Sequence, residues 1–173
     1  LSAASLIAAI DPRKATRSAR SMMTTNQTDS PMRVLHIEDD AELATLIARG
    51  VEKSDQGRVV IHHVADLKSA LIAINRDEFD VVLADLNLPD SQGTRTIKRL
   101  VAVRRQMPVV VFSAVDEESA VIEILQSGAQ EYIVKGRGDG HTVVRALRQA
   151  IERKRAEMNL QRLAHYDSLT GLA

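Results

Sequence analysis

Short, strongly apolar runs alternate with helical patterns from Met32 onward, and this alternation restricts the fold more than any other feature of the chain. Each run is too apolar for a strand with one solvent-exposed face, so helices are expected on both faces of the sheet. Strands that alternate with helices are typical of βαβ units around a parallel sheet. The sequence therefore predicts an α/β fold, with a doubly wound parallel sheet of five strands and a long C-terminal helix.

The positions of the elements follow from the periodicity. Strands are expected at 33–37, 58–64, 81–84, 109–112 and 132–134. Helices are expected at 41–53, 67–76, 94–105 and 117–127, with a last long helix from near His141. Asp66 and Asp116 are predicted N-caps, because an Asp side chain accepts hydrogen bonds from the free N–H groups of a first turn. Gly50 and Gly128 are predicted stop signals, since glycine readily adopts the left-handed conformation that follows a last turn, although Gly50 comes three residues before the expected helix end at 53.

The composition describes the core and excludes several classes of function. The 173 residues suffice for one domain with extensions, and with only 2 Phe, 2 Tyr and no Trp the core is expected to be aliphatic. The 23 basic and 23 acidic residues give zero formal net charge, so no nucleic-acid or membrane partner is predicted. No cysteine is present, which excludes disulfides and thiolate sites and fits a cytoplasmic location.

Residues 1–31 precede the first strand and are rich in Ser, Thr, Ala and Arg, a composition that predicts a disordered leader. The apolar run at 1–10 is too short to span a bilayer, and its basic residues follow it, so neither an anchor nor an export signal is predicted. Because the chain begins with Leu, the sequence is expected to be a fragment or to have a displaced start.

Polar side chains stand at the ends of the expected strands. They are Glu38, Asp39 and Asp40 after the first strand, Asp85 after the third, Ser113 after the fourth and Lys135 after the fifth. In a doubly wound sheet the carboxyl ends of the strands share one edge, so these side chains are expected to meet there. Carboxylates held so close repel strongly without a counter-charge. All-oxygen ligands without His or Cys favour Mg²⁺ over Zn²⁺ in that role.

The chemistry expected at this edge is phosphoryl transfer. A carboxylate beside Mg²⁺ can attack a phosphorus centre and form an acyl phosphate, provided that the charge on the transferring oxygens is neutralised. Asp85 is the candidate nucleophile. Lys135 is expected to pair with the phosphoryl group, and the Ser113 hydroxyl is expected to donate a hydrogen bond to one of its oxygens.

Four sequence blocks resemble the signature blocks of response-regulator receiver domains from two-component systems. The blocks are VLHIEDD (34–40), DVVLADLNLPDSQG (80–93), VVVFSA (109–114) and GAQEYIVK (128–135). They occur in order, and the resemblance covers residues 32–152. It implies a receiver domain with the flavodoxin-like fold, which is a signalling switch and not an enzyme, apart from its own phosphotransfer and dephosphorylation.

The resemblance also implies a role for individual residues. The implied metal ligands are Glu38, Asp39, Asp85 and the main-chain carbonyl of Asn87. Asp85 is the implied phosphorylated residue, Ser113 and Tyr132 are the implied switch pair, and the implied partner is a histidine kinase or phosphotransfer protein. The sequence departs from the family at Gly136, where the family has Pro after the lysine, so the resemblance does not define the loop before the last helix.

The segment 153–173 is predicted to be a linker helix and the start of a truncated output domain. A spacing of three and four residues joins Val144, Leu147, Ile151, Lys154, Met158 and Gln161. Two alternatives remain open for this pattern, a weak coiled coil that forms a homodimer and a charged, solvated linker helix. The final residues LAHYDSLTGLA (163–173) resemble the opening segment of a diguanylate cyclase (GGDEF) domain, whose GTP site is absent from this chain. Phosphorylation is therefore expected to regulate a downstream cyclase.

Two other functions compete with this hypothesis. A hydrolase that uses Asp85 as a transient nucleophile would need a cap insertion, and the sequence contains none. A pseudo-receiver that binds a partner without phosphorylation would be expected to lack the acceptor or the lysine, and both are present. His36 is predicted to be a hydrogen-bonded structural histidine. His62 and His63 are not expected to chelate a metal together, because adjacent strand residues face opposite sides.

Overall fold

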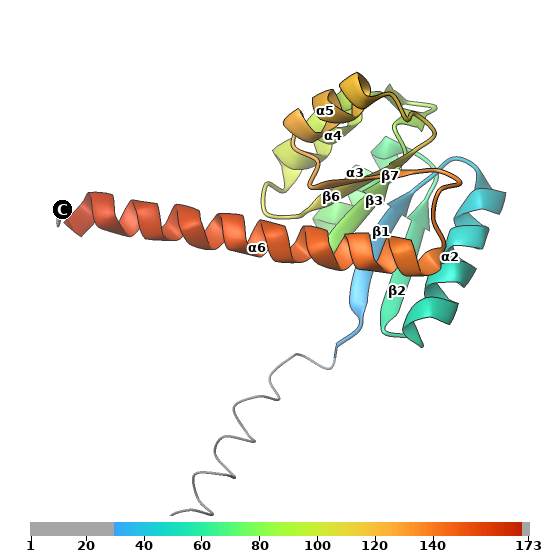
Figure 1. Ribbon diagram of the computed structural model, residues 1–173, viewed down its shortest axis with the longest axis horizontal. Coiled ribbons are helices and arrows are strands. Elements are labelled where there is room, and N and C mark those ends of the chain that lie inside the picture. The colour runs from blue at the N-terminus through green and yellow to red at the C-terminus, as the bar shows by residue number, and fades with distance from the viewer. Residues whose placement is uncertain (1–29, 171–173) are drawn as a thin grey trace, which may run out of the picture. The chain divides into compact units, whose positions relative to one another are not determined.

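Figure 1 shows the computed structural model of the chain, in which residues 30–170 are described, with their side chains up to residue 164. A parallel sheet of five strands in the order β2-β1-β3-β6-β7 forms its centre. Helices lie on both sides of this sheet (Figure 1). The predicted α/β architecture is confirmed, whereas the predicted leader lies outside the described residues except for Ser30 and Pro31.

The observed elements differ from the predicted bounds by at most two residues. The strands of the central sheet are β1 (Met32–Ile37), β2 (Val59–Val64), β3 (Val81–Ala84), β6 (Val109–Ser113) and β7 (Glu131–Val134). The helices are α2 (Ala41–Asp55), α3 (Leu67–Arg76), α4 (Thr94–Val103), α5 (Glu118–Gln126) and α6 (Gly140–Thr170). Two very short strands, β4 (Asn87–Leu88) and β5 (Ser91–Gln92), pair antiparallel between β3 and α4. Their length gives no periodic signal, so the sequence does not predict them.

The central sheet has a separate apolar core on each side, because alternate residues of a strand face opposite sides. On one side, Val34 and Leu83 pack with buried residues of α2 and α6, such as Leu147. On the other side, Leu35 and Leu67 belong to a cluster that includes residues of α3 and α4. Burial on both faces explains why the strands are continuous apolar runs.

Two of the predicted helix boundaries are confirmed by local geometry. The carboxylate of Asp66 accepts a hydrogen bond from the Ser69 N–H at 2.7 Å and caps α3. Gly128 follows the C-cap of α5 with a φ of 110°, in the left-handed region that suits glycine.

Two other predicted boundaries are wrong, each because of a tertiary contact. Asp116 does not cap α5 but forms an ion pair of 2.6 Å with Arg137, in the loop before α6. Gly50 does not end α2, which continues to Asp55. The next residue, Val51, is buried in the core, and this packing outweighs the helix penalty of about 1 kcal/mol for glycine.

The most apolar stripe of the last helix, α6, packs against the core of this chain. Val144 and Leu147 are buried in the core under the sheet, and Ile151 packs against that core. The apolar part of the predicted coiled-coil pattern therefore faces this chain's own core, which favours the linker alternative up to Ile151. Farther along, where α6 continues beyond the sheet (Figure 1), Leu160 and Leu163 are 68% and 65% exposed. Among the described helices, none is both long and apolar enough to cross a membrane.

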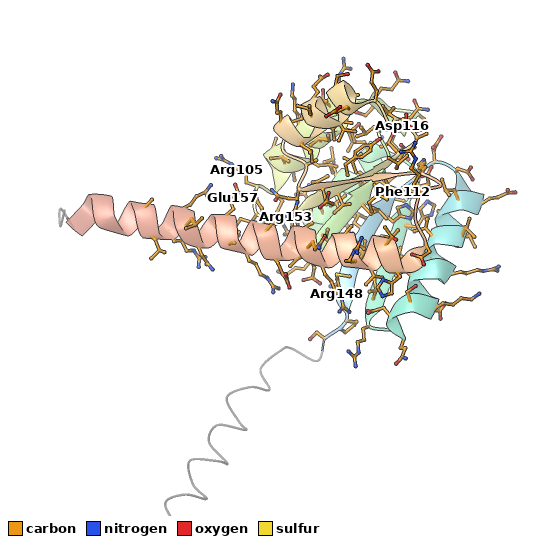
Figure 2. The ribbon with its side chains drawn as sticks, in the orientation of Figure 1. Arg105, Phe112, Asp116, Arg148, Arg153 and Glu157 are labelled. Atoms are coloured by element: carbon orange, nitrogen blue, oxygen red, sulfur yellow. The ribbon has the colours of Figure 1, made fainter. Side chains whose placement is uncertain are left out.

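Ion pairs fix α6 to its neighbours on either side. Arg148 pairs with Asp55 at the end of α2 at 2.5 Å, and Arg153 pairs with Glu131 at the start of β7 at 3.0 Å. Figure 2 shows Arg148 and Arg153 along the helix. The direction of α6 is thus set by its buried stripe and by contacts with α2 and β7.

The beginning of α6 approaches α2 closely, at a point where Gly140 faces Gly50. A Cβ atom added to Gly140 would overlap the main-chain carbonyl of Gly50 and lie 2.7 Å from the nitrogen of Val51. A Cβ atom added to Gly50 would meet only Gly140, at 3.4 Å from its Cα, which is close to ordinary contact. The contact therefore requires glycine on α6 but not on α2.

We expect Gly140→Ala to reduce the free energy of unfolding by about 1–3 kcal/mol, since the added methyl must push α6 away from rigid backbone. Gly50→Ala, the matched substitution on the facing helix, is expected to be neutral or to stabilise by up to about 1 kcal/mol through helix propensity. Urea denaturation of both variants measures the difference. Equal effects of the two substitutions would contradict this account of the contact.

Candidate functional site

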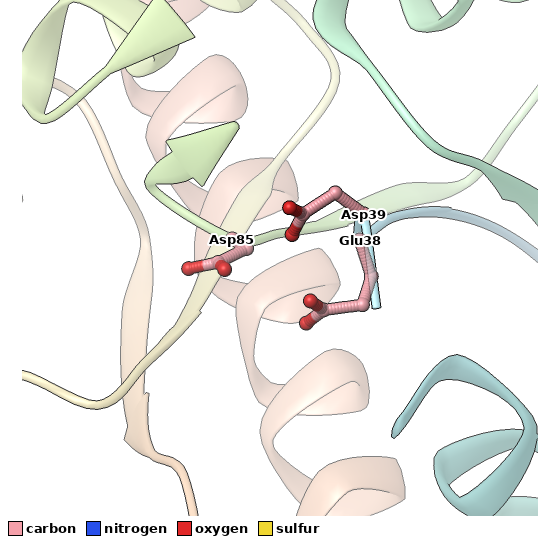
Figure 3. Close-up of side chains that lie close together, drawn as sticks. All are labelled: Glu38, Asp39 and Asp85. Carbon is pink, nitrogen blue, oxygen red and sulfur yellow. The ribbon is translucent and has the colours of Figure 1, made fainter. Parts of the chain in front are cut away.

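The residues that the sequence assigns to the site come from the carboxyl ends of four parallel strands. Glu38 and Asp39 follow β1, Asp85 follows β3, Lys135 follows β7, and Ser113 is the last residue of β6. The parallel direction of the strands brings these ends to one edge. Figure 3 shows the side chains of Glu38, Asp39 and Asp85 close together.

The ammonium group of Lys135 joins two buried carboxylates. Its Nζ lies 2.7 Å from Oε2 of Glu38 and 2.8 Å from Oδ2 of Asp85, whose side chains are only 1% and 7% exposed. The contact with Asp85 is a charged hydrogen bond, and the contact with Oε2 of Glu38 is an ion pair. The main-chain N–H of Leu86 donates to the other oxygen of Asp85, Oδ1, at 2.6 Å. Both oxygens of Asp85 are therefore held in place.

At this edge, burial and neighbouring charges shift the pKa of each group in opposite directions. Burial raises the pKa of Glu38 above its usual range, and this effect outweighs the opposing influence of the Lys135 ammonium. Burial alone would lower the pKa of Lys135, but the adjoining carboxylates of Asp85 and Glu38 outweigh it, so the pKa of Lys135 is raised. The lysine is therefore a permanent positive charge at neutral pH.

Three carboxylates at this edge are arranged to share a cation. Oxygen atoms of Glu38, Asp39 and Asp85 lie within 4.8 Å of one another. At that separation, two full charges repel by roughly 3 kcal/mol at an effective dielectric of about 20. One ammonium balances only one of the three charges. Oxygen donors with this deficit fit a hard divalent cation such as Mg²⁺.

Two further acidic residues near the edge stabilise helices. Asp40 is the N-cap of α2, where its carboxylate accepts hydrogen bonds from the N–H groups of Glu42 and Leu43 at 2.9 and 3.1 Å. Its position directly before a helix is the signal that could have shown this role. Asp90 accepts hydrogen bonds from the first two N–H groups of α3 at 2.9 and 2.8 Å. Asp90 is distant from α3 in sequence, so no local pattern predicts its role.

A pocket of about 970 Å³ opens beside Asp85, with walls that include residues of α4 and α5. Asn87, Ser113 and Lys135 also line this pocket. The structure thus brings the predicted nucleophile, hydroxyl and ammonium group to one pocket. Within the described part of the chain, neither Asn87 nor Ser113 forms a hydrogen bond with the clustered carboxylates.

Comparison with known proteins agrees with this geometry. The profile of the response regulator receiver domain family matches residues 34–148. The chain belongs to this family. It is 33% identical over 107 residues to a protein-glutamate methylesterase/protein-glutamine glutaminase of Azospirillum brasilense. It is 28% identical over 104 residues to the swarming motility regulation protein RssB of Serratia marcescens.

These matches cover 61% and 60% of this receiver chain but 27% and 46% of the two relatives, so the chain spans less than half the length of either. Among solved structures, the receiver domain of Francisella response regulator 1452 superposes with a TM-score of 0.62 at 27% identity, over 70% of this chain and 98% of that one. A CheY-like receiver domain from Methanospirillum hungatei superposes with a TM-score of 0.64 at 21% identity, over 74% and 99% of the two chains, which supports the fold alone.

In this receiver, Tyr132 is bound to the loop that follows β6. Its hydroxyl donates to the main-chain carbonyl of Val115 and lies 3.5 Å from that of Ser113. Burial raises the pKa of Tyr132, so the phenol remains a donor at neutral pH. The two residues of the predicted switch pair are therefore linked through the backbone of one loop.

The departure from the family at Gly136 has a structural reason. This residue has a φ of 82°, in the left-handed region that glycine adopts without strain. A proline ring holds φ near −65° and could not adopt this backbone. The loop after Lys135 in this receiver is therefore built for glycine.

The prediction for His36 is wrong. This side chain is completely buried, and neither ring nitrogen has a hydrogen-bond partner among the described residues. Its ring centre lies 5.9 Å from that of His63, whose Nε2 lies 2.7 Å from the main-chain oxygen of Glu38. Burial, followed by the influence of His63 and Lys135, lowers the pKa of His36 from 6.5 to about 4. His36 is therefore neutral at physiological pH.

We expect the protein to lose up to about 3 kcal/mol of stability between pH 6.5 and pH 4 through His36. The sign follows from the lowered pKa, because the unfolded chain takes up a proton in this range before the folded chain does. His36→Leu is expected to remove this part of the pH dependence, which urea denaturation in Mg²⁺-free buffer measures. His62→Leu, at an exposed histidine on β2, is the control and should follow the native curve. If the stability of His36→Leu depended on pH as that of the native protein does, the assignment of this pH dependence to His36 would be wrong.

Proposed function

We propose that this receiver accepts a phosphoryl group on Asp85 in a Mg²⁺-dependent reaction and acts as a signalling switch. The observation that carries the proposal is the hydrogen bond of 2.8 Å between Lys135 and Asp85 inside a cluster of three carboxylates. Asp85 lines the pocket, whereas Glu38 and Asp39 are not among its lining residues. A phosphorus centre in the pocket would meet this carboxylate first.

The residues of the chain divide the work of this reaction. An oxygen of Asp85 forms the new bond to phosphorus, and the Leu86 N–H keeps the carboxylate oriented. The Lys135 ammonium moves from the unphosphorylated carboxylate of Asp85 to the phosphoryl oxygens. Its positive charge neutralises those oxygens in the transition state. Ser113 lines the same pocket and supplies a hydroxyl for one phosphoryl oxygen.

Glu38, Asp39 and Asp85 would hold Mg²⁺, together with the main-chain carbonyl of Asn87. The close approach of three carboxylates and their uncompensated charge support this assignment. When bound, the cation supplies charge neutralisation for the phosphoryl oxygens. Glu38 and Asp39 would orient and retain the ion, and movement of Lys135 to the phosphoryl group would release Oδ2 of Asp85 for attack.

Ser113 and Tyr132 would transmit the change as a switch pair. The Tyr132 hydroxyl is bonded to the carbonyl of Val115, two residues after Ser113. A shift of Ser113 toward a phosphoryl group moves this carbonyl, so the loop and the tyrosine change together. The partner that delivers the phosphoryl group is a histidine kinase or phosphotransfer protein in the cytoplasm. The alternative, a pseudo-receiver, has no explanation for an intact acceptor and lysine.

We expect incubation with acetyl phosphate and Mg²⁺ to add one phosphoryl group to the native chain, detected by intact mass. Asp85→Asn is expected to give no adduct, because the amide nitrogen is a poor nucleophile. Asp39→Asn is expected to reduce the adduct at limiting Mg²⁺, and excess Mg²⁺ should restore it. Glu42→Gln, an exposed acid outside the cluster, is the control. Absence of the adduct on the native chain would favour the pseudo-receiver.

We also propose that α6 passes the signal to a diguanylate cyclase domain through a homodimer. The resemblance of 163–173 to the start of such a domain supports the first part. The exposed Leu160 and Leu163 support the second, since both lie on α6 beyond the residues that pack in the core. The stripe that ends at Ile151 takes no part in this contact, because it is already buried.

We expect phosphorylation to convert the chain from monomer to dimer, as measured by sedimentation velocity. Replacing both Leu160 and Leu163 by Gln is expected to keep the phosphorylated chain monomeric, since their burial drives the association. Val103→Gln, at another exposed apolar residue, is the control. A native chain that is fully phosphorylated by mass but remains monomeric would contradict the dimer.

A further inference from the structure

The pocket beside Asp85 has a charged wall that the proposed function does not use. Arg95 and Lys98, on the first two turns of α4, line the pocket. Both side chains are exposed, and neither forms an ion pair or a side-chain hydrogen bond within the described part of the chain. Across the pocket, α5 contributes one carboxylate, Glu123.

The charge of this wall is not balanced along the sequence. No acidic residue occurs between Asp90 and Asp116, and the basic residues in that interval are Arg95, Lys98, Arg99, Arg104 and Arg105. Most charges on a helix surface are simply solvated, and that explanation suffices for Arg99 and Arg105, which do not line the pocket. Arg95 and Lys98 differ because they share the pocket with Asp85.

The geometry of the reaction places part of the phosphodonor near this wall. In phosphoryl transfer, the attacking oxygen, phosphorus and leaving atom are roughly in line. Asp85 is held by Lys135 and by the Leu86 N–H, so its free approach is from the pocket. The leaving group therefore occupies the pocket, where the charges of Arg95 and Lys98 act on it across a short distance.

We infer that Arg95 and Lys98 are specificity-determining residues that favour phosphodonors with an anionic leaving group, of the acyl phosphate class. The inference rests on the proposed phosphorylation of Asp85. In the step, an oxygen of Asp85 forms a bond to phosphorus, the bond from phosphorus to the acyl oxygen breaks, and its electron pair departs on a carboxylate. The two cations attract the dianionic donor and stabilise the carboxylate as it leaves.

A donor with a nitrogen leaving group provides the comparison. Phosphoramidate carries less negative charge than acetyl phosphate, and its leaving group takes up a proton and departs as neutral ammonia. The charges of Arg95 and Lys98 are therefore expected to accelerate phosphorylation by this donor only slightly. The ratio of the two phosphorylation rates measures the discrimination, and a general loss of folding or Mg²⁺ binding would lower both rates together.

We expect Arg95→Gln and Lys98→Gln each to reduce the second-order rate with acetyl phosphate by about tenfold, within the range of electrostatic steering, and the rate with phosphoramidate by less than about twofold. Arg105→Gln, which removes the same charge from beyond the end of α4, should change neither rate (Figure 2 labels Arg105). Glu123→Gln should raise the acetyl phosphate rate, because it removes a negative charge from the opposite wall. The differences should shrink near 1 M salt, where the screening length falls to about 3 Å.

A binding measurement separates recognition from chemistry. Acetylphosphonate resembles acetyl phosphate but cannot transfer its phosphorus, and its affinity can be followed by NMR shifts of residues around the pocket. We expect weaker binding to Arg95→Gln and Lys98→Gln and native binding to Arg105→Gln. Equal losses with both donors, or unchanged binding of the phosphonate, would overturn the inference. If the native chain is phosphorylated by neither donor, the proposed function fails instead.

Discussion

A single ammonium group between two buried carboxylates is the interaction on which this site depends. Glu38 and Asp85 are almost completely enclosed, and burying such charges without a partner is strongly unfavourable. Lys135 makes the arrangement stable, but one ammonium cannot balance the three carboxylates of the cluster. The same contact therefore holds the folded edge together and leaves negative charge there, which is the basis for the proposed binding of Mg²⁺ and a phosphoryl group.

The surrounding loops are fixed by contacts that leave the cluster free. The carboxylates of Asp40 and Asp90 accept hydrogen bonds from helix N–H groups and do not belong to the cluster. Tyr132 holds the loop after β6 through its backbone. On the other side of the sheet, the approach of Gly140 to Gly50 sets where α6 begins, close after the loop that carries Lys135. The site and the start of α6 are therefore neighbours in the chain.

Sequence reasoning succeeded where the signal is local. The helix α3 was predicted with its observed bounds, since its apolar spacing and the cap at Asp66 lie within one segment. It failed where a distant residue decided the outcome. Asp116 carries a cap-like signal but pairs with Arg137. His36 carries no sign that its ring nitrogens would remain without partners. The apolar stripe of α6 fits a second helix or the chain's own sheet equally well on spacing alone, and it packs against the sheet.

By itself, the sequence determined that five apolar strands alternate with helices and that acidic, hydroxyl and lysine side chains stand at the strand ends. These features depend on the order of residues along the chain, and parallel strands must then gather their ends at one edge. Only the tertiary structure decided that Asp39 joins the carboxylate cluster while its neighbour Asp40 caps a helix, and that Arg95 and Lys98 share a pocket with Asp85. The reason is physical: periodicity fixes the direction of a side chain relative to its own helix or strand, whereas its partner depends on how segments remote in sequence pack together.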